Sequence, residues 1–182
     1  MEEKALEIKN LTKRYGEITA VDNVSFEIET GECFGFLGPN GAGKTTTINC
    51  ITGISNLSEG QIKVFGFDVV KQYREARRQI GFCPQEFNVD VFSGPKRILN
   101  YIAGYYGLTK KERIPRIKEI LERFGLEPFA DRNFVALSGG LKRRMMLARA
   151  MVHDPEFLIL DEPTAGLDVE SKHELWQYLK EL

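Results

Sequence analysis

The sequence has few of the residues that build disulfide frameworks and metal clusters. Its 182 residues include three cysteines, Cys33, Cys50 and Cys83, and two histidines. The number of cysteines is odd and no two of them are spaced as C-x-x-C, so the pattern argues against a disulfide scaffold and against a zinc site. We expect the cysteines to be small buried hydrophobic residues in a reducing compartment, which favours a cytoplasmic protein.

Long apolar runs and a large net charge are also absent. No run approaches the roughly 18 apolar residues of a membrane-spanning helix, and the opening MEEKALEIKN lacks the pattern of a signal peptide. The 25 basic and 26 acidic side chains nearly cancel, so we expect no nucleic-acid partner. Any role at a membrane would therefore depend on a partner protein.

The sequence does contain 42% hydrophobic residues, enough for the core of one soluble domain. ALEIKN and NVSFEIE alternate apolar and polar residues, which predicts half-exposed antiparallel strands. CFGFLG and FLILD are nearly continuous apolar runs, which predicts buried parallel strands. PKRILNYIAGYYGL and KKERIPRIKEILERFGL predict a helical insert over residues 88–137, with Pro115 at or near the first turn of its second helix.

Residues 36–47, FLGPNGAGKTTT, contain G-x-x-x-x-G-K-T between an apolar run and the helical pattern TTTINCIT. Glycine lacks a β-carbon, so successive backbone N–H groups of this loop can turn toward a phosphate, and the helix start adds its positive end. Lys44 would then reach the β- and γ-phosphates, Thr45 would ligate Mg²⁺, and Thr46 would lie at the α-phosphate. A glycine-rich turn that carries a lysine is the alternative, and the flanking strand and helix favour a phosphate loop.

A second stretch, FLILDEPTAGLD, places two carboxylates where a predicted strand ends. Open α/β sheets bind their ligands at this end of the strands. We expect Asp161 to hold Mg²⁺ and Glu162 to orient or deprotonate the water that attacks a phosphate. DEP can also be a polar turn after a strand, and the phosphate loop elsewhere in the chain favours the functional interpretation.

A third stretch, LSGGLKRRMMLARAM, predicts a helix that begins after two glycines, with Ser138 as its N-cap. It is a second helix start that can face an anion. Two such starts of one subunit do not easily hold the same nucleotide, so we expect a symmetric dimer in which each helix start closes the other subunit's site. An ordinary capped helix is the alternative.

These stretches, with CPQE at Gln85 and GLD ending at Asp168, resemble in their order the ATP-binding domain of ABC transporters. FGFLGPNGAGKTT and SGGLKRR are most similar to the separate ATPase subunits of bacterial and archaeal ABC exporters. The resemblance covers essentially the whole chain. It implies an α/β P-loop NTPase with an N-terminal antiparallel β portion and an inserted helical subdomain. One ABC ATPase domain would span residues 1–182, with its nucleotide-binding core at 1–87 and 138–182 and its insert at 88–137.

The resemblance also implies where ATP and Mg²⁺ bind. Tyr15 would stack on adenine, where a strand-end tyrosine packed on the core is the alternative. Lys44, Gln85 and Glu162 would be catalytic, and Gln85 would touch Mg²⁺ or the attacking water. The metal ligands would be Thr45, Gln85 and Asp161. Further nucleotide contacts would come from Gly38, Asn40, Gly41, Gly43, Thr45, Thr46 and, across the dimer, Ser138, Gly139, Gly140 and Asp168.

The implied partners are a second ATPase subunit, bound when ATP binds, and a transmembrane permease subunit docked on the helical insert. Phe87 or Phe92 could form that docking surface or could pack in the core. The protein would lie in the cytoplasm, peripheral on the inner face of the cell membrane. A soluble ABC ATPase without a transport role is an alternative, disfavoured because the segment between Gln85 and Ser138 lacks long heptad repeats. A fragment that only binds nucleotide is another.

Two departures from the family pattern stand out. Leu141 replaces the common glutamine, with little expected loss, and the following KRR, residues 142–144, is expected to be a solvated helix face. The family's switch histidine lies on a strand after the last predicted helix, and His173 lies inside that helix. We therefore expect a C-terminally truncated domain that lacks its last strands, keeps nucleotide binding and has weak or absent turnover.

Overall fold

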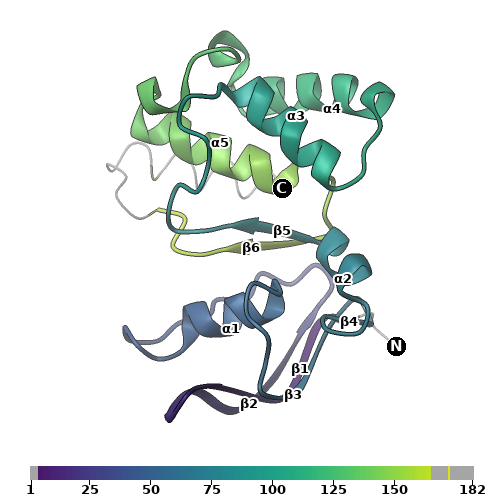
Figure 1. Ribbon diagram of the computed structural model, residues 1–182, viewed down its shortest axis with the longest axis vertical. Helices are drawn as coiled ribbons and strands as arrows, with labels where there is room; N and C mark the ends of the chain where they lie inside the picture. The colour runs from purple at the N-terminus through teal and green to yellow at the C-terminus, as the bar shows by residue number, and fades with distance from the viewer. Residues whose placement is uncertain (1–3, 165–171, 173–182) are drawn as a thin grey trace. The chain divides into compact units, whose positions relative to one another are not determined.

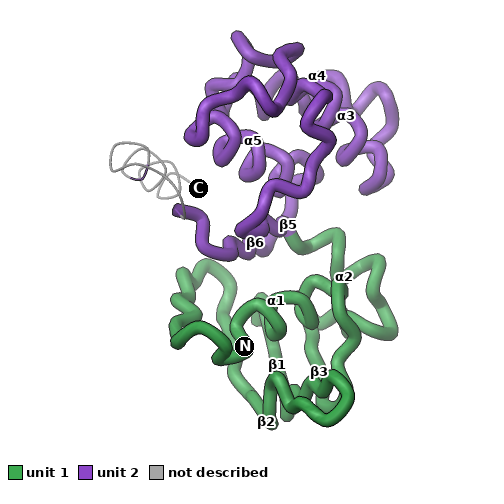
Figure 2. The backbone as a smooth tube through the Cα atoms, turned by 60° about the vertical axis from the view of Figure 1, so that its left-hand side comes forward, with its two compact units in different colours: residues 1–80 green, residues 81–182 purple. Residues whose placement is uncertain are grey.

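The computed structural model describes residues 4–164 and residue 172, which divide into two compact units at Ile80 (Figure 2). Unit 1 contains a four-stranded antiparallel sheet in the order β2-β1-β3-β4 and two helices (Figure 1). Its elements are β1 Lys4–Tyr15, β2 Ile18–Glu29, α1 Lys44–Ile51, β3 Glu59–Val64, β4 Phe67–Asp68 and α2 Tyr73–Gln79. The expected N-terminal antiparallel β portion is therefore confirmed.

The strands β1 and β2 pair along their whole length, from Lys4 opposite Glu29 to Tyr15 opposite Ile18. Burial in β1 alternates from Leu6 to Ile8, as the period-two pattern predicts, and the buried neighbours Leu11 and Thr12 break the alternation. Leu6 and Ile8 are each 1% exposed and meet the buried Val64 and Ile62 of β3 across the sheet. One face of the sheet is thus apolar, and the other is polar.

The prediction of a buried strand at CFGFLG is wrong for the described structure. Residues 33–40 form no strand, and Leu37 is 91% exposed. An apolar run becomes a buried parallel strand only where strands pair on both of its sides, and the sheet of unit 1 does not include it. Instead Phe34 stacks on Phe26 of β2 with ring centroids 5.3 Å apart. Cys33 is exposed, against expectation, whereas Cys50 and Cys83 are buried as predicted.

Over residues 80–164, unit 2 contains a two-stranded sheet and three α-helices that share one core. Its elements are β5 Ile80–Cys83, α3 Pro95–Tyr105, α4 Lys110–Arg123, the 3₁₀ turns η1 Glu127–Phe129 and η2 Phe134–Ala136, α5 Gly139–Met151 and β6 Phe157–Leu160. Leu99 of α3, Ile120 of α4 and Met146 of α5 are 0% exposed and belong to a single hydrophobic cluster. The predicted helices of the insert are confirmed, and they pack on the helix that LSGG begins.

The ends of the two insert helices follow local sequence signals. Pro95 occupies the first turn of α3, where its missing N–H costs nothing. Thr109 and Glu112 form a capping box at the start of α4, in which the Thr109 N–H donates to Glu112 Oε2 at 2.7 Å. Because this cap starts α4 at Lys110, Pro115 lies inside the helix, beyond the first turn where we expected it.

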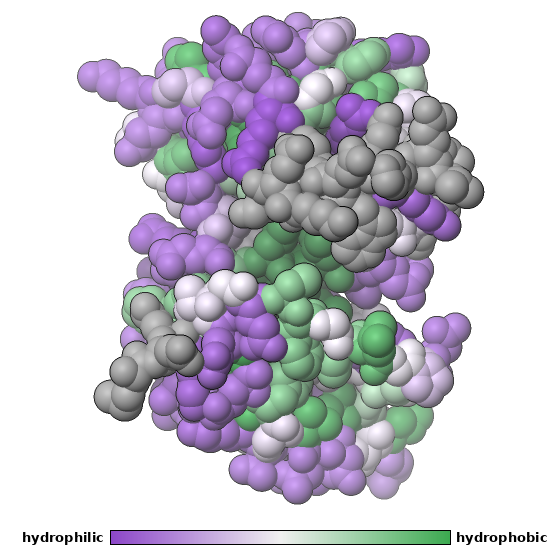
Figure 3. Space-filling view, turned by 180° about the vertical axis from the view of Figure 1, so that it is seen from behind, coloured by the Kyte–Doolittle hydropathy of each residue, from purple (hydrophilic) through white to green (hydrophobic). Residues whose placement is uncertain are grey.

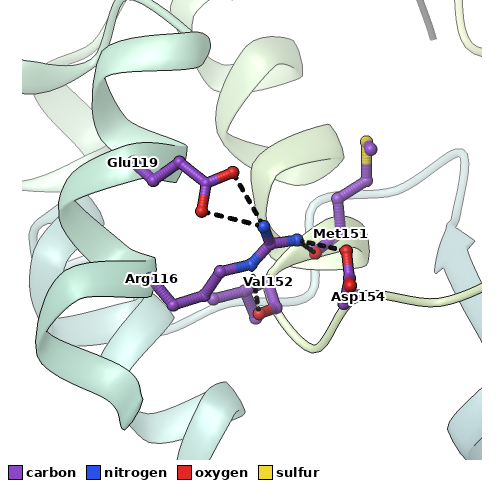
Figure 4. A network of polar contacts seen from close by, with 5 residues as sticks. All are labelled: Arg116, Glu119, Met151, Val152 and Asp154. Atoms are coloured by element: carbon purple, nitrogen blue, oxygen red, sulfur yellow. Dashed lines mark hydrogen bonds and ion pairs between the residues drawn. The ribbon is translucent and has the colours of Figure 1, made fainter. Parts of the chain in front are cut away.

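Arg116 of α4 fixes the C-terminal end of α5, as Figure 4 shows. Its guanidinium donates to the carbonyl oxygens of Met151 and Val152 at 3.0 and 3.2 Å. It also pairs with the carboxylates of Asp154 and Glu119, both at 2.8 Å. Carbonyls at a helix C-terminus lack intrahelical donors, so a cation placed here satisfies them and complements the helix dipole.

Among the helices that the structure describes, none combines the length and the apolar character needed to cross a bilayer. The face drawn in Figure 3 shows both hydrophilic and hydrophobic areas, with hydrophobic residues gathered in the middle of the lower half. The even mixture of charges in the composition is consistent with such a surface.

Candidate nucleotide-binding site

The glycines of the phosphate loop have backbone angles that other residues rarely adopt. Gly41 has φ 83° and Gly43, the N-cap of α1, has φ 85°. A β-carbon on Gly43 would lie 2.5 Å from the carbonyl oxygen of Ala20, closer than atoms approach. Glycine at position 43 is therefore required both by φ and by space. This turn leads directly into α1, so the loop ends at a helix start whose amides can face an anion.

The side chain of Lys44 folds back over the loop that precedes it. Its ammonium group donates to the carbonyl oxygens of Gly38 and Pro39 at 2.6 and 2.9 Å. This holds a positive charge at the mouth of the loop, where a phosphate would replace the two carbonyls. Thr45, in the first turn of α1, is exposed, and Thr46 is half-buried. The loop thus offers backbone amides, an ammonium and a hydroxyl, which are the groups that bind phosphate and its metal ion.

Tyr15 lies at the end of β1 and is 49% exposed, so it is not the core residue of the alternative interpretation. Its hydroxyl lies 3.3 Å from Ser55 Oγ. The ammonium of Lys13 lies 4.5 Å from the ring centroid. An exposed aromatic ring held at its polar end can stack on a planar base.

In unit 2 the two carboxylates differ in their exposure. Asp161 directly follows β6 and is 8% exposed, and its backbone N–H donates to the carbonyl oxygen of Cys83 at 3.0 Å. Glu162 is exposed and has φ 47°, in the left-handed region. Few residues other than glycine occupy this region, so the turn carries backbone strain that the surrounding contacts must support.

Gln85 and Glu162 contact each other. The side-chain amide of Gln85 donates to Glu162 Oε2 at 2.9 Å, joining the exits of β5 and β6. An amide donor that holds a carboxylate this way fixes the direction in which its second oxygen points. That oxygen is available to accept a proton from water, as a general base in phosphoryl transfer does.

The N-terminus of α5 is capped as predicted, because Ser138 Oγ accepts a hydrogen bond from Leu141 N–H at 3.3 Å. Gly140 and Gly139, in the first turn, leave the helix start open to solvent. The expectation that KRR forms a solvated face is wrong at its centre, since Arg143 is 2% exposed. The helical period could have shown this, because positions 146, 147 and 150 share its face and are all buried.

Each of the three residues expected to hold magnesium carries an oxygen donor. Mg²⁺ prefers hard oxygen ligands and usually takes one or two carboxylates, with water and phosphate oxygens filling its other positions. Thr45 supplies a hydroxyl, Asp161 a carboxylate and Gln85 an amide. Within residues 4–164 and 172, no group of three or more His, Cys, Asp or Glu side chains could hold a metal by itself. Asp168 and His173, both named in the sequence analysis, lie outside the described residues.

Comparison with known proteins identifies the family of this chain. Residues 21–165 match the ABC transporter family. The chain is 43% identical over its whole length to the Nod factor export ATP-binding protein I of Paraburkholderia xenovorans (strain LB400). It is 42% identical to the protein of that name from Rhizobium meliloti (strain 1021), over 98% of this chain and 53% of the relative. The chain spans 60% of the Paraburkholderia protein, so it covers little more than half the length of these relatives.

Similar solved structures belong to the same family. The ATP-binding cassette MJ0796, a dimer bound to ADP and Pi in a post-hydrolysis state, matches with a TM-score of 0.85 and 30% identity, over 97% of this chain and 82% of that one. The cbiO1 protein of Clostridium perfringens, part of the ABC transporter complex cbiONQ, has a TM-score of 0.85 and 31% identity, over 99% and 74% of the two chains. The phosphate loop, the paired Gln85 and Glu162, and the capped LSGG helix therefore belong to an ABC transporter ATP-binding domain, and the chain is a member of the ABC transporter family.

Proposed function

We propose that this chain binds MgATP and that it belongs to an ATPase that hydrolyses MgATP to drive export through a membrane partner. The observation that carries the proposal is the hydrogen bond between Gln85 and Glu162, which brings together two residues far apart in the sequence. Phosphoryl transfer needs a group that orients the attacking water and a group that neutralises charge on the phosphates. Glu162 takes the first role, and Lys44 with Mg²⁺ takes the second.

The chemistry follows from the two sets of side chains. Lys44 and the amides of the phosphate loop would hold the β- and γ-phosphates, while Thr45, Asp161 and Gln85 would hold Mg²⁺. The carboxylate of Glu162 accepts a proton from the water that attacks the γ-phosphate. Tyr15 stacks on the adenine ring. The roles of Tyr15 and Gln85 come from the resemblance to ABC ATPases, and the exposure of both side chains is consistent with them.

ATP would lie between two copies of the chain. The start of α5, with Ser138, Gly139 and Gly140, would face the γ-phosphate held by the other copy's phosphate loop. A helix start with an open first turn suits an anion. The dimeric state of MJ0796 with ADP and Pi supports this arrangement. Asp168 is proposed to lie at the seam of the dimer.

The membrane partner would dock on the helical insert, where Phe92 is 75% exposed. Phe87 is a weaker candidate, because its ring packs on Phe134 with the centroids 5.6 Å apart. The chain would act as a peripheral protein on the cytoplasmic face of the membrane. The export direction is supported by the names of the relatives, which are export ATP-binding proteins.

The proposal is tested by measuring ATP binding and steady-state MgATP hydrolysis by the 182-residue chain, beside its Glu162→Gln variant. Both proteins should bind ATP, because Glu162 acts on the water and not on the nucleotide. Any turnover should depend on Glu162. Absence of ATP binding, or turnover equal in the two proteins, would refute the proposal.

A further inference from the structure

Arg143 is a buried arginine whose hydrogen bonds all go to the backbone. Arg143 is 2% exposed. Its guanidinium has five N–H donors. Nε donates to the Pro163 carbonyl at 2.6 Å, Nη1 to those of Pro84 and Gln85 at 2.9 and 3.3 Å, and Nη2 to those of Glu162 and Asp161 at 2.5 and 3.3 Å. Every donor of the side chain is therefore used.

These five carbonyls belong to the two segments that carry the water-activating pair. The carbonyls of positions 84 and 85 follow β5, and those of positions 161–163 follow β6. Arg143 itself lies on α5, so one side chain joins that helix to both strand exits. The bond between Gln85 and Glu162 spans the same two segments. Arg143 thus holds the backbone of both segments in place, and Gln85 joins the same segments through its side chain.

The choice of acceptors has an electrostatic consequence. A buried cation must be solvated by the protein, and five carbonyl dipoles do this without a carboxylate partner. The Glu162 carboxylate consequently accepts from the neutral amide of Gln85 and is not neutralised by an ion pair with Arg143. The side chain of Glu162 is therefore held by Gln85, while Arg143 holds its backbone.

The acceptors also support a strained turn. Glu162 has φ 47°, and a residue other than glycine holds such an angle only where its surroundings determine it. Arg143 binds the carbonyls of Glu162 itself and of the residue on each side. Lysine could not do the same, because its single ammonium cannot reach five acceptors arranged along a planar fork.

We propose that Arg143 is a positioning residue for ATP hydrolysis, which holds Glu162 and Gln85 in the geometry that activates water. This inference rests on the proposed function. Because Ser138, the N-cap of α5, faces the other copy's nucleotide under that function, Arg143 also connects that contact to the chain's own Glu162. Seating of the helix start on one nucleotide then aligns the base that acts on the other.

Arg116 provides a matched control in the same unit. Its guanidinium also donates to two backbone carbonyls, those of Met151 and Val152, but at the opposite end of α5 and without contact to either strand exit (Figure 4). Substitution of either arginine removes hydrogen bonds that join α5 to another segment of the unit. Only loss of Arg143 should release the segments that carry Gln85 and Glu162.

The first test compares amide hydrogen exchange in the wild-type chain, Arg143→Lys and Arg116→Lys. Exchange should rise at the amides of residues 85, 86, 161, 162 and 164 in Arg143→Lys and should stay at the wild-type level there in Arg116→Lys. If Arg143→Lys does not fold, Arg143→Gln, which keeps two donors without the charge, takes its place. Unchanged exchange at these residues, or an equal rise in both variants, would overturn the proposal.

The second test measures cleavage of radiolabelled ATP under single-turnover conditions, which detects slow hydrolysis, together with ATP affinity. Arg143→Lys should cleave about 10- to 100-fold more slowly than the wild type with unchanged affinity, because small displacements of a catalytic group cost this much. Arg116→Lys should cleave at the wild-type rate. Cleavage by Arg143→Lys at the wild-type rate would overturn the positioning role. Failure of the wild type to bind ATP would instead refute the proposed function, and the exchange comparison would still decide the role of Arg143.

Discussion

Gln85 and Glu162 are 77 positions apart in the sequence, and the amide of one donates to the carboxylate of the other at 2.9 Å. The contact forms because β5 and β6 are neighbours in one sheet and each residue lies just beyond its strand. It places a fixed carboxylate at the edge where an open sheet binds its ligands. The catalytic proposal depends on this contact, and the first prediction follows from it.

Glu162→Gln should remove the general base and keep the shape of the site. We expect hydrolysis to fall by about 10²- to 10⁴-fold, the usual contribution of a general base. Because ATP is then bound and not consumed, the variant should accumulate as a dimer in the presence of MgATP. Light scattering coupled to size exclusion, with MgATP and with MgADP, measures this. A variant that stays monomeric with MgATP would argue against the dimeric site.

Gly43→Ala should lower the free energy of unfolding by more than the cost of the backbone angle alone. The angle φ 85° costs about 1–2 kcal/mol for a residue with a β-carbon, and contact with the Ala20 carbonyl at 2.5 Å adds to this. Gly31→Ala is the control, with φ 83° and no atom within 4 Å of the added carbon. Urea unfolding should show a larger loss for Gly43→Ala, and only that variant should lose ATP affinity. Equal losses in both variants would mean that the contact has no effect.

The three cysteines should differ in their reactivity toward iodoacetamide. Burial raises the pKa of the Cys83 thiol to about 11, and the charges of Arg143 and Arg149 lower it only in part. Burial also raises the pKa of Cys50, while Cys33 is exposed. At pH 8 about one Cys83 side chain in a thousand would be the reactive thiolate, and the fraction grows as the pH approaches 11. Mass spectrometry of the labelled native chain should find Cys33 modified first, and early labelling of Cys83 would contradict its burial.

Alanine substitutions of Phe87 and Phe92 should distinguish a ring that packs in the core from a ring that is free to contact a partner. Phe87 packs edge-to-face on Phe134, an arrangement that contributes about 0.5–1.5 kcal/mol beyond its buried area. Phe92 is 75% exposed, so its removal should leave the free energy of unfolding nearly unchanged. Urea unfolding of Phe87→Ala and Phe92→Ala measures the difference. A marked loss of stability in Phe92→Ala would show that this ring packs in the domain and would weaken its role in docking.

Local signals in the sequence predicted those parts of the fold that depend on near neighbours. The alternation in residues 5–10 predicts β1, and the glycine-rich loop followed by TTTINCIT predicts α1 to within one residue at each end. Ser138 caps α5 as expected because capping needs only the first turn of the helix. The contact of Gln85 with Glu162 was not predicted, since neither segment alone specifies its neighbour, and the family resemblance implied only that both residues act near the attacking water.

The failures concern partners that lie far away in the sequence. CFGFLG is apolar enough for a buried strand, but apolarity does not specify which strands will pair with it. Pro115 was placed too near the start of α4, because the cap at Thr109 sets that start. Arg143 was expected in solvent because buried arginines are rare. Five carbonyls from two other segments make its burial possible, and no local pattern encodes them.

The most direct test of the account is equilibrium binding of a fluorescent ATP analogue with Mg²⁺ to the wild-type chain and to Lys44→Ala. Lys44 holds its charge at the carbonyls of Gly38 and Pro39, where the phosphates would lie. Loss of a charge-assisted hydrogen bond should weaken binding by about 10- to 100-fold. Saturable binding by the wild type that weakens in this way is the predicted result. No binding by the wild type, or equal binding by both proteins, would contradict the nucleotide site.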